Sequence, residues 1–154
     1  MLRPTVKNYL DNNQIEYAQI EHQRAFTAEE VAQTAHIPAR RFCKTVIVAI
    51  DGDMVMVVLH ADERINLERL RESVGAKAVH LLSEADFEDR FPDCEVGAMP
   101  PFGDLFHLPV IVSESVASES TMTFNAGTHT DLVLIPYNDF HRLVNPRVGT
   151  FASH

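Results

Sequence analysis

The stretch Gly97–Gly103, which reads Gly-Ala-Met-Pro-Pro-Phe-Gly, is a candidate for chemistry because packing alone does not require its composition. Its two consecutive prolines, Pro100 and Pro101, fix the backbone angle φ at about −65° and remove two hydrogen-bond donors. A backbone held this rigidly presents its carbonyls and remaining N–H groups in fixed directions. Such groups can orient a small polar substrate or stabilise a developing oxyanion. A stiff connector between two strands is the structural alternative.

Lys44 is a second candidate, because it stands near the start of an apolar, strand-like run. In an alternating strand its side chain shares a face with Val46, Val48 and Ile50. Lysine is almost never fully buried unless it is paired. Lys44 therefore either places an ammonium group in a pocket or extends that group to solvent from the end of the strand.

The apolar runs on either side of Asp51-Gly52-Asp53 predict a β-hairpin. We expect all three residues to form the loop, which places Lys44 opposite His60 on one face of the sheet. A two-residue turn would shift the register by one residue and send the two side chains to opposite faces. With the three-residue loop, Lys44 and His60 would form the mouth of a pocket.

A histidine and an aspartate follow a glycine turn in the segment Phe124-Asn125-Ala126-Gly127-Thr128-His129-Thr130-Asp131. Gly127 fits a hairpin or bulge turn between two strands. His129 and Asp131 alternate onto one face of the strand, and the pair could orient an imidazole as a general base. A polar strand edge explains the two residues equally well.

Metal and thiol chemistry find little support in the sequence. The chain has eight histidines but no HxH, HExxH or His/Cys cluster, so we predict no metal site. Cys43 and Cys94 fit neither a disulfide framework nor a C-x-x-C motif, which favours reduced thiols in a cytoplasmic protein. The carboxylates beside Cys94 would raise its pKa, so a structural cysteine is the better interpretation.

Short helices and strands that alternate along the chain must position these residues. Pro4, Thr27 with Glu30, Asn66, Ser83 and Pro136 mark helix starts. Gly75 marks the end of the helix that starts at Asn66. The helix after Thr27 should place Ala28, Val31, Ala32 and Ala35 on one face, and strands are expected at 16–22, 42–50, 54–60, 79–82, 108–113, 122–125 and 130–135. This pattern predicts an α/β (α+β) fold, with residues 1–154 forming a single domain around a mixed central sheet flanked by short helices.

The composition is that of an ordinary globular protein, with 45% hydrophobic and 23% charged residues in a chain of 154. No apolar run approaches the roughly 20 residues of a membrane span, so we expect no membrane partner. The 13 basic and 22 acidic residues give a formal net charge of −9. This charge argues against a wide phosphate-binding surface, and hence against DNA, but allows a small basic pocket near Arg40, Arg41 and Lys44.

Lys44 at the opening of its strand, the Gly97…Pro101 spacing and Phe124-Asn125-Ala126-Gly127 together resemble the YbaK/EbsC family. These are free-standing trans-editing proteins related to the editing domain inserted in bacterial prolyl-tRNA synthetases. The likeness spans roughly residues 4 to 147. It implies a mixed α/β fold and hydrolysis of mischarged aminoacyl-tRNA, without a metal or organic cofactor. Lys44 matches the key functional residue of the family, and Gly97 and Pro101 match the pair that shapes the aminoacyl pocket.

The resemblance also implies that the partner is the acceptor end of a mischarged tRNA, and the acidic balance fits work beside an aminoacyl-tRNA synthetase or an elongation factor. Donors from the Gly97–Gly103 loop would stabilise the oxyanion. A protonated Lys44 would either offset the oxyanion charge or anchor the terminal phosphate or ribose. His60, His129 or a substrate hydroxyl are the candidates for activating water. The expected substrate-binding residues are Thr45, His60, Ala98, Met99, Pro100, Phe102, Gly103, Asn125, Gly127 and His129, of which Thr45, Met99, Phe102 and His129 are expected to line the pocket.

Two other function classes remain open at this stage. One is a catalytically idle binding module for the tRNA acceptor end or a small ligand. The other is a different hydrolase that uses Cys94 or the His129–Asp131 pair.

Overall fold

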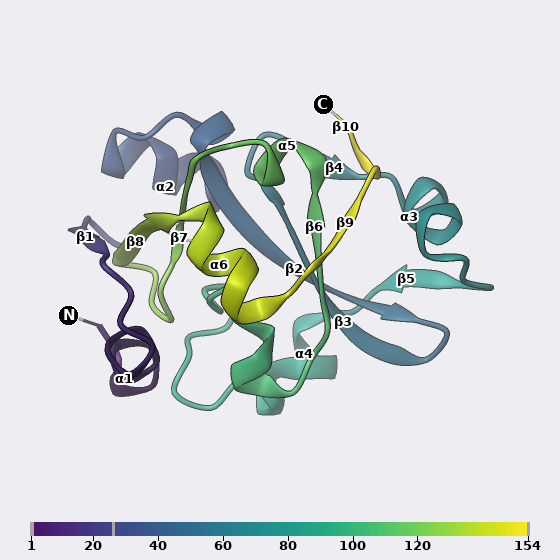
Figure 1. Ribbon diagram of the computed structural model, residues 1–154, viewed down its shortest axis with the longest axis horizontal. Coiled ribbons are helices and arrows are strands. Elements are labelled where there is room, and N and C mark those ends of the chain that lie inside the picture. Colours follow the sequence, from purple (N-terminus) through teal and green to yellow (C-terminus); the bar gives the residue numbers. More distant parts are fainter. Residues whose placement is uncertain (1, 26, 154) are drawn as a thin grey trace.

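The structure, a computed structural model, describes residues 2–25 and 27–153. In this part of the chain the backbone folds around a mixed eight-stranded sheet with the strand order β1-β8-β7-β2-β3-β6-β9, to which β5 adds on β2 (Figure 1). The strands of this sheet are β1 (Ala18–Glu21), β2 (Phe42–Ile50), β3 (Asp53–His60), β5 (Val79–Leu81), β6 (Val110–Ser113), β7 (Thr121–Asn125), β8 (Asp131–Pro136) and β9 (Arg147–Gly149). β4 (Arg64–Ile65) and β10 (Ala152–Ser153) pair with each other separately.

Short helices connect and cover the strands. They are α1 (Pro4–Asn12), α2 (Ala28–Ala35), α3 (Leu67–Val74), α4 (Glu84–Phe87), α5 (Glu114–Ala117) and α6 (Tyr137–Val144), with 3₁₀ turns η1 (Ala39–Arg41), η2 (Glu88–Arg90) and η3 (Gly103–Phe106). β2 runs parallel to β7, β3 to β6 and β6 to β9, while the other neighbours are antiparallel. The predicted mixed sheet with short helices is confirmed.

Apolar side chains cover both faces of the central strands, as the continuous apolar runs predict. Ile47 and Val48 are sequence neighbours in β2, yet they pack into different clusters. Ile47 joins a cluster that includes Phe140 of α6, and Val48 joins one that includes Leu70 of α3. Figure 1 shows α6 crossing one face of the sheet. Among the described residues, no helix is both long enough and apolar enough to cross a membrane.

Several predicted helix ends are confirmed because they depend on local hydrogen bonds. The Asn66 side chain accepts the Arg69 N–H at 3.0 Å at the start of α3, and Gly75 ends that helix in the left-handed conformation. Thr27 Oγ1 accepts the Glu30 N–H at 3.1 Å at the start of α2. Val31 of α2 is buried, as expected; the side chains of Ala28 and Ala32 lie outside the described residues.

The predicted register of the β2–β3 hairpin is wrong. Ile50 pairs with Asp53, so the turn has two residues, and Lys44 pairs with Leu59 instead of His60. Asp51 and Gly52 both have positive φ, +50° and +86°, as a type I′ turn requires. The Asp51 carboxylate also accepts N–H groups of residues 77 and 78 at 2.9 Å, which holds the turn in place.

Candidate functional site

A small cavity lies where β2 separates from β7. β2 pairs with β7 at Phe42 and Cys43 and with β5 from Val48 onward, and the cavity lies beside the residues in between. Its volume is about 130 Å³. The residues that line it are Thr27, Phe42, Cys43, Lys44, Thr45, Val46, Gly97, Met99 and Asn125. Residues from the strand, the proline loop and the β7–β8 turn are therefore brought to one place.

Lys44 provides the positive charge of this cavity. Its side chain is half-buried, and its Nζ donates to the carbonyl oxygen of Ala61 at 3.3 Å. Ala61 follows β3 directly, so the end of one strand positions the ammonium group that the neighbouring strand carries. An ammonium group in a partly desolvated cavity interacts more strongly with a developing negative charge than it would in bulk water.

Gly97 forms the exposed corner of the proline loop. Its φ is +86°, a conformation that side chains disfavour, and its N–H contacts Met99 Sδ at 3.3 Å. The next four residues, 98–101, are buried. Ala98 O accepts the Gly127 N–H at 2.9 Å, which ties the loop to the β7–β8 turn. Gly97 and Met99 are the loop residues that line the cavity.

The second half of the proline loop belongs to the hydrophobic core. Phe102 is fully buried, and its ring centroid lies 4.6 Å from that of Tyr9 and 5.2 Å from that of Phe124. At Gly103, a Cβ would collide with the Leu108 carbonyl oxygen. The expectation that Phe102 lines the pocket is therefore wrong, because aromatic partners from distant segments hold it in the core. Ala98, Pro100, Pro101 and Gly103 are likewise buried and lie outside the lining.

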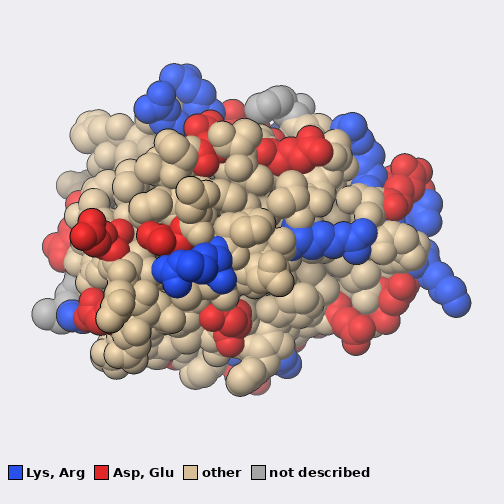
Figure 2. Space-filling view, viewed as in Figure 1, with Lys and Arg blue, Asp and Glu red and all other residues tan. Residues whose placement is uncertain are grey.

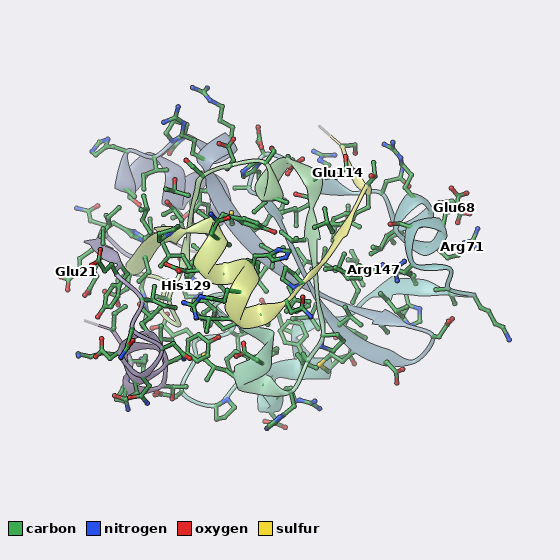
Figure 3. The ribbon with its side chains drawn as sticks, in the orientation of Figure 1. Glu21, Glu68, Arg71, Glu114, His129 and Arg147 are labelled. Atoms are coloured by element: carbon green, nitrogen blue, oxygen red, sulfur yellow. The ribbon has the colours of Figure 1, made fainter. Side chains whose placement is uncertain are left out.

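His129, labelled in Figure 3, packs against Gly97 of the proline loop. It is 5% exposed, and its Nε2 lies 2.8 Å from the carbonyl oxygen of Val96. A Cβ on Gly97 would lie 3.5 Å from the imidazole Cε1. His129 precedes β8, so strand alternation does not govern its direction, and it lies outside the cavity lining.

The predicted His129–Asp131 pair does not form. The carboxylate near His129 is Glu95, whose Oε2 accepts the His129 N–H at 2.9 Å. Asp131 instead accepts hydrogen bonds from the Thr128 hydroxyl and from Gln19. Burial raises the pKa of Asp131, but favourable interactions, of which the Thr128 hydrogen bond is the largest, lower it below its ordinary value.

Glu95 connects several segments around the proline loop, a role that its sequence context did not reveal. The Arg24 guanidinium group donates to both Glu95 oxygens, at 2.9 to 3.2 Å. Arg3 lies 3.8 Å from the same carboxylate. The Glu95 N–H donates to Gly127 O at 2.8 Å, and Gly127 has a φ of +94°. Gly127 therefore shapes the loop from outside the cavity lining.

His60 lies away from Lys44. It ends β3, pairs in register with Cys43, and its Nδ1 lies 3.5 Å from Glu63 Oε1. It lines other cavities beside Arg41. The Lys44–His60 pocket mouth is thus a wrong prediction, and its cause is the two-residue turn.

Asn125, at the end of β7, contributes an acceptor to the cavity lining. Its Oδ1 is buried and makes no hydrogen bond with the described residues. A buried acceptor without a partner is costly, so a ligand that donates to it would restore a hydrogen bond. Thr27 and Thr45 add hydroxyls to the same lining. The sequence signal at Thr27 indicated a helix cap, and nothing in it pointed to the cavity.

Residues 22–143 match the model of a family described as the aminoacyl-tRNA editing domain. The chain belongs to this family. It is 26% identical over 119 residues to the proline–tRNA ligases of Bacillus mycoides KBAB4 and Bacillus cereus AH187, a match that covers 76% of this chain. The matched segment spans 21% of each ligase. The resemblance inferred from Lys44, Gly97 and Pro101 is thereby confirmed at the level of the family.

Solved structures share the fold of this editing domain. The crystal structure of a candidate trans-editing enzyme for prolyl-tRNA synthetase superposes with a TM-score of 0.80 at 16% identity, covering 100% of both chains. The crystal structure of a hypothetical protein superposes with a TM-score of 0.85 at 18% identity, covering 97% of this chain and 99% of the other. At these identities the superpositions establish the fold alone.

The two thiols of the editing domain are poor nucleophiles. Burial raises the pKa of Cys43 to about 12. Burial, and then the nearby Asp93 carboxylate, raise the pKa of Cys94 to about 11. Both thiols are therefore protonated near neutral pH. No group of three or more His, Cys, Asp or Glu residues suited to a metal ion occurs in the described part of the chain.

Proposed function

We propose that this editing domain acts in trans to hydrolyse mischarged aminoacyl-tRNA, releasing a small amino acid from the 3′ end. The observation that carries the proposal is that Lys44 and Gly97 line one cavity within an editing-domain fold. A cation and a left-handed backbone corner then face the same small volume. These are the groups that ester hydrolysis needs around a developing oxyanion.

In the proposed reaction a water oxygen attacks the ester carbonyl carbon, and the carbonyl oxygen gains negative charge. The bond from carbon to the ribose oxygen then breaks, and that oxygen takes a proton. Lys44 offsets the negative charge. The Gly97 N–H contacts the Met99 thioether, a weak acceptor that an oxyanion displaces readily. One well-aimed donor is worth about 3–4 kcal/mol of transition-state stabilisation.

The water is activated by the substrate in this proposal. The nine lining residues include neither a histidine nor a carboxylate. His60 and His129, the side-chain candidates for a general base, lie outside the lining. The ribose hydroxyl next to the ester is therefore the group that we assign to the proton transfer. Asn125 Oδ1 would accept a hydrogen bond from the α-ammonium group of the amino acid.

The size of the cavity supports a small amino acid. A volume of about 130 Å³ accommodates side chains of the alanine, serine, cysteine or threonine class. Pockets that select by size distinguish one methylene by only about 1–3 kcal/mol, so close relatives compete. The formal net charge of −9 supports contact with the acceptor end alone, beside a synthetase or an elongation factor.

The test is a deacylation panel with alanyl-, seryl-, threonyl- and cysteinyl-tRNA. Wild type should release at least one amino acid above the buffer rate, and Lys44→Ala should reduce this rate by about a hundredfold or more. Lys77→Ala is the matched control, because Lys77 is an exposed lysine remote from the cavity lining. Absence of release from every tRNA would refute the hydrolase. Binding of charged tRNA without turnover would instead support the idle binding module.

A further inference from the structure

A second cleft opens at the other end of α2. It comprises a cavity of about 480 Å³ and an adjoining one of about 300 Å³, which share Arg41, His60 and Glu119 in their linings. We call it the Arg41 cleft. The lining also includes the carboxylates Asp62 and Glu63 and the apolar side chains Ile20, Ile37 and Leu134.

Two arginines form the cationic rim of the Arg41 cleft. Arg40 and Arg41 are exposed, and neither guanidinium group makes a hydrogen bond or an ion pair within the described part of the chain. Arg24, by contrast, is held by Glu95. Figure 2 shows basic side chains projecting from the edge of the molecule near α2. Unengaged guanidinium groups beside a cleft are suited to bind phosphate.

The rest of the lining favours a nucleotide over a simple anion. Ile20, Ile37 and Leu134 supply an apolar surface for a base. The exposed carboxylate of Glu119 at the rim would repel a free anion but can accept a hydrogen bond from the exocyclic amine of a base. Glu63 is buried, and its carboxylate already accepts hydrogen bonds from the Ser115 hydroxyl and the His60 N–H. We therefore assign it no contact with the ligand.

The Arg41 cleft and the small cavity lined by Lys44 and Gly97, which we call the Lys44 cavity, lie at opposite ends of α2. Thr27, at the N-terminal end of α2, lines the Lys44 cavity, and His36, just past its C-terminal end, lines the cleft. The eight residues of α2 span about 12 Å. Arg41 and Lys44 are three residues apart in sequence, at most about 11 Å along an extended chain. A chain of two or three nucleotides covers this separation.

We propose that the Arg41 cleft binds the single-stranded nucleotides immediately 5′ of the aminoacylated terminal nucleotide. The inference rests on the proposed deacylase function. One phosphate lies against Arg40 and Arg41, and a base with an exocyclic amine lies against the apolar surface and Glu119. The cleft thereby aligns the ester with Lys44, and the long substrate gains affinity that a short one lacks.

The experiment compares two substrates that carry the same amino acid: full-length aminoacyl-tRNA and the aminoacyl ester of adenosine alone. Arg41→Glu should raise KM for the tRNA by about tenfold or more and leave kcat/KM for the adenosine ester unchanged. Arg69→Glu is the matched control, because it makes the same charge change at an exposed residue of α3. α3, which carries Glu68 and Arg71 in Figure 3, lies at the far end of the molecule from α2.

A direct binding measurement separates failure of the inference from failure of the deacylase proposal. The probe is a fluorescent single-stranded oligonucleotide ending in CCA, followed by anisotropy at several salt concentrations. Arg41→Ala should weaken binding and reduce the slope of log K against log salt by about 0.7 for the lost phosphate contact. Arg41→Lys should keep most of the slope.

Equal effects of Arg41→Glu on both substrates, or no effect on tRNA hydrolysis and oligonucleotide binding, would overturn the inference. If wild type cleaves neither substrate, the deacylase proposal fails. In that case weaker oligonucleotide binding by Arg41→Glu and not by Arg69→Glu would still identify the cleft as a nucleotide site, and unchanged binding would reject it.

Discussion

Gly97 rests on the imidazole ring of His129. A Cβ built on the glycine would lie 3.5 Å from Cε1 of the ring, and the ring in turn contacts the Val96 carbonyl oxygen at 2.8 Å. Histidine and glycine therefore act together to fix the direction of the Gly97 N–H. In the proposed function His129 is a positioning residue, and the chemistry is assigned to groups that line the cavity.

The conformation of Gly97 gives a prediction with an internal control. Gly97→Ala should lower the free energy of unfolding by about 1–2 kcal/mol, because its φ of +86° disfavours any Cβ. Gly52 has the same φ and open space around it, so Gly52→Ala should cost a similar amount. Deacylation by Gly97→Ala should fall at least about tenfold while Gly52→Ala stays near wild type. Denaturant unfolding and single-turnover deacylation measure the two effects; equal losses of activity would contradict a role for the loop corner.

Asn125 should affect binding more than stability. Asn125→Ala removes a buried acceptor that lacks a partner, so the free energy of unfolding should change by less than about 1 kcal/mol. KM for the aminoacyl ester should rise by about tenfold, because the α-ammonium group loses its acceptor. Asn138→Ala on the exposed face of α6 is the control. An unchanged KM would remove Asn125 from the proposed substrate contacts.

The thiols predict a loss of stability at alkaline pH. The pKa values of Cys43 and Cys94 in the folded protein are about 12 and 11, whereas an unfolded cysteine titrates at about 8.5. The unfolded state therefore releases these protons first as the pH rises. The free energy of unfolding should decrease from about pH 8.5 upward, until the pH passes the folded values.

Melting temperatures at pH 8 and pH 10 measure this effect. The decrease between the two pH values should be smaller in a Cys43→Ala, Cys94→Ala double variant than in wild type. Burial and the hydrogen bond to Asp104 also raise the pKa of Tyr9. Tyr9 is present in both proteins, so its contribution cancels in the comparison. An identical decrease in the two proteins would show that the buried thiols titrate normally.

Features that depend on local contacts could be predicted from the sequence. Asn66 and Gly75 bound α3 through hydrogen bonds within a few residues, and both ends were expected. The position of the β2–β3 hairpin was also expected, but its register was not. The left-handed Asp51 in that turn is held by the backbone of residues 77 and 78, which no local pattern reveals.

The candidate site also has features that the sequence predicts and features that depend on distant contacts. Its family could be inferred from residue types and spacing. The resemblance to that family implied the approach of Lys44 to the proline loop, although the roles of those residues stay predictions. Which half of the loop faces the cavity could not be inferred. Phe102 turns inward because Tyr9 and Phe140, from opposite ends of the chain, stack around it. Such long-range partners become visible only once the chain is folded.

Arg41 ends η1 and Lys44 follows it in β2, and this order assigns a polarity to an RNA that occupies both proposed sites. In the proposed function the esterified 3′ terminus lies at Lys44, so the RNA chain would run 5′ to 3′ in the same sense as the polypeptide enters β2.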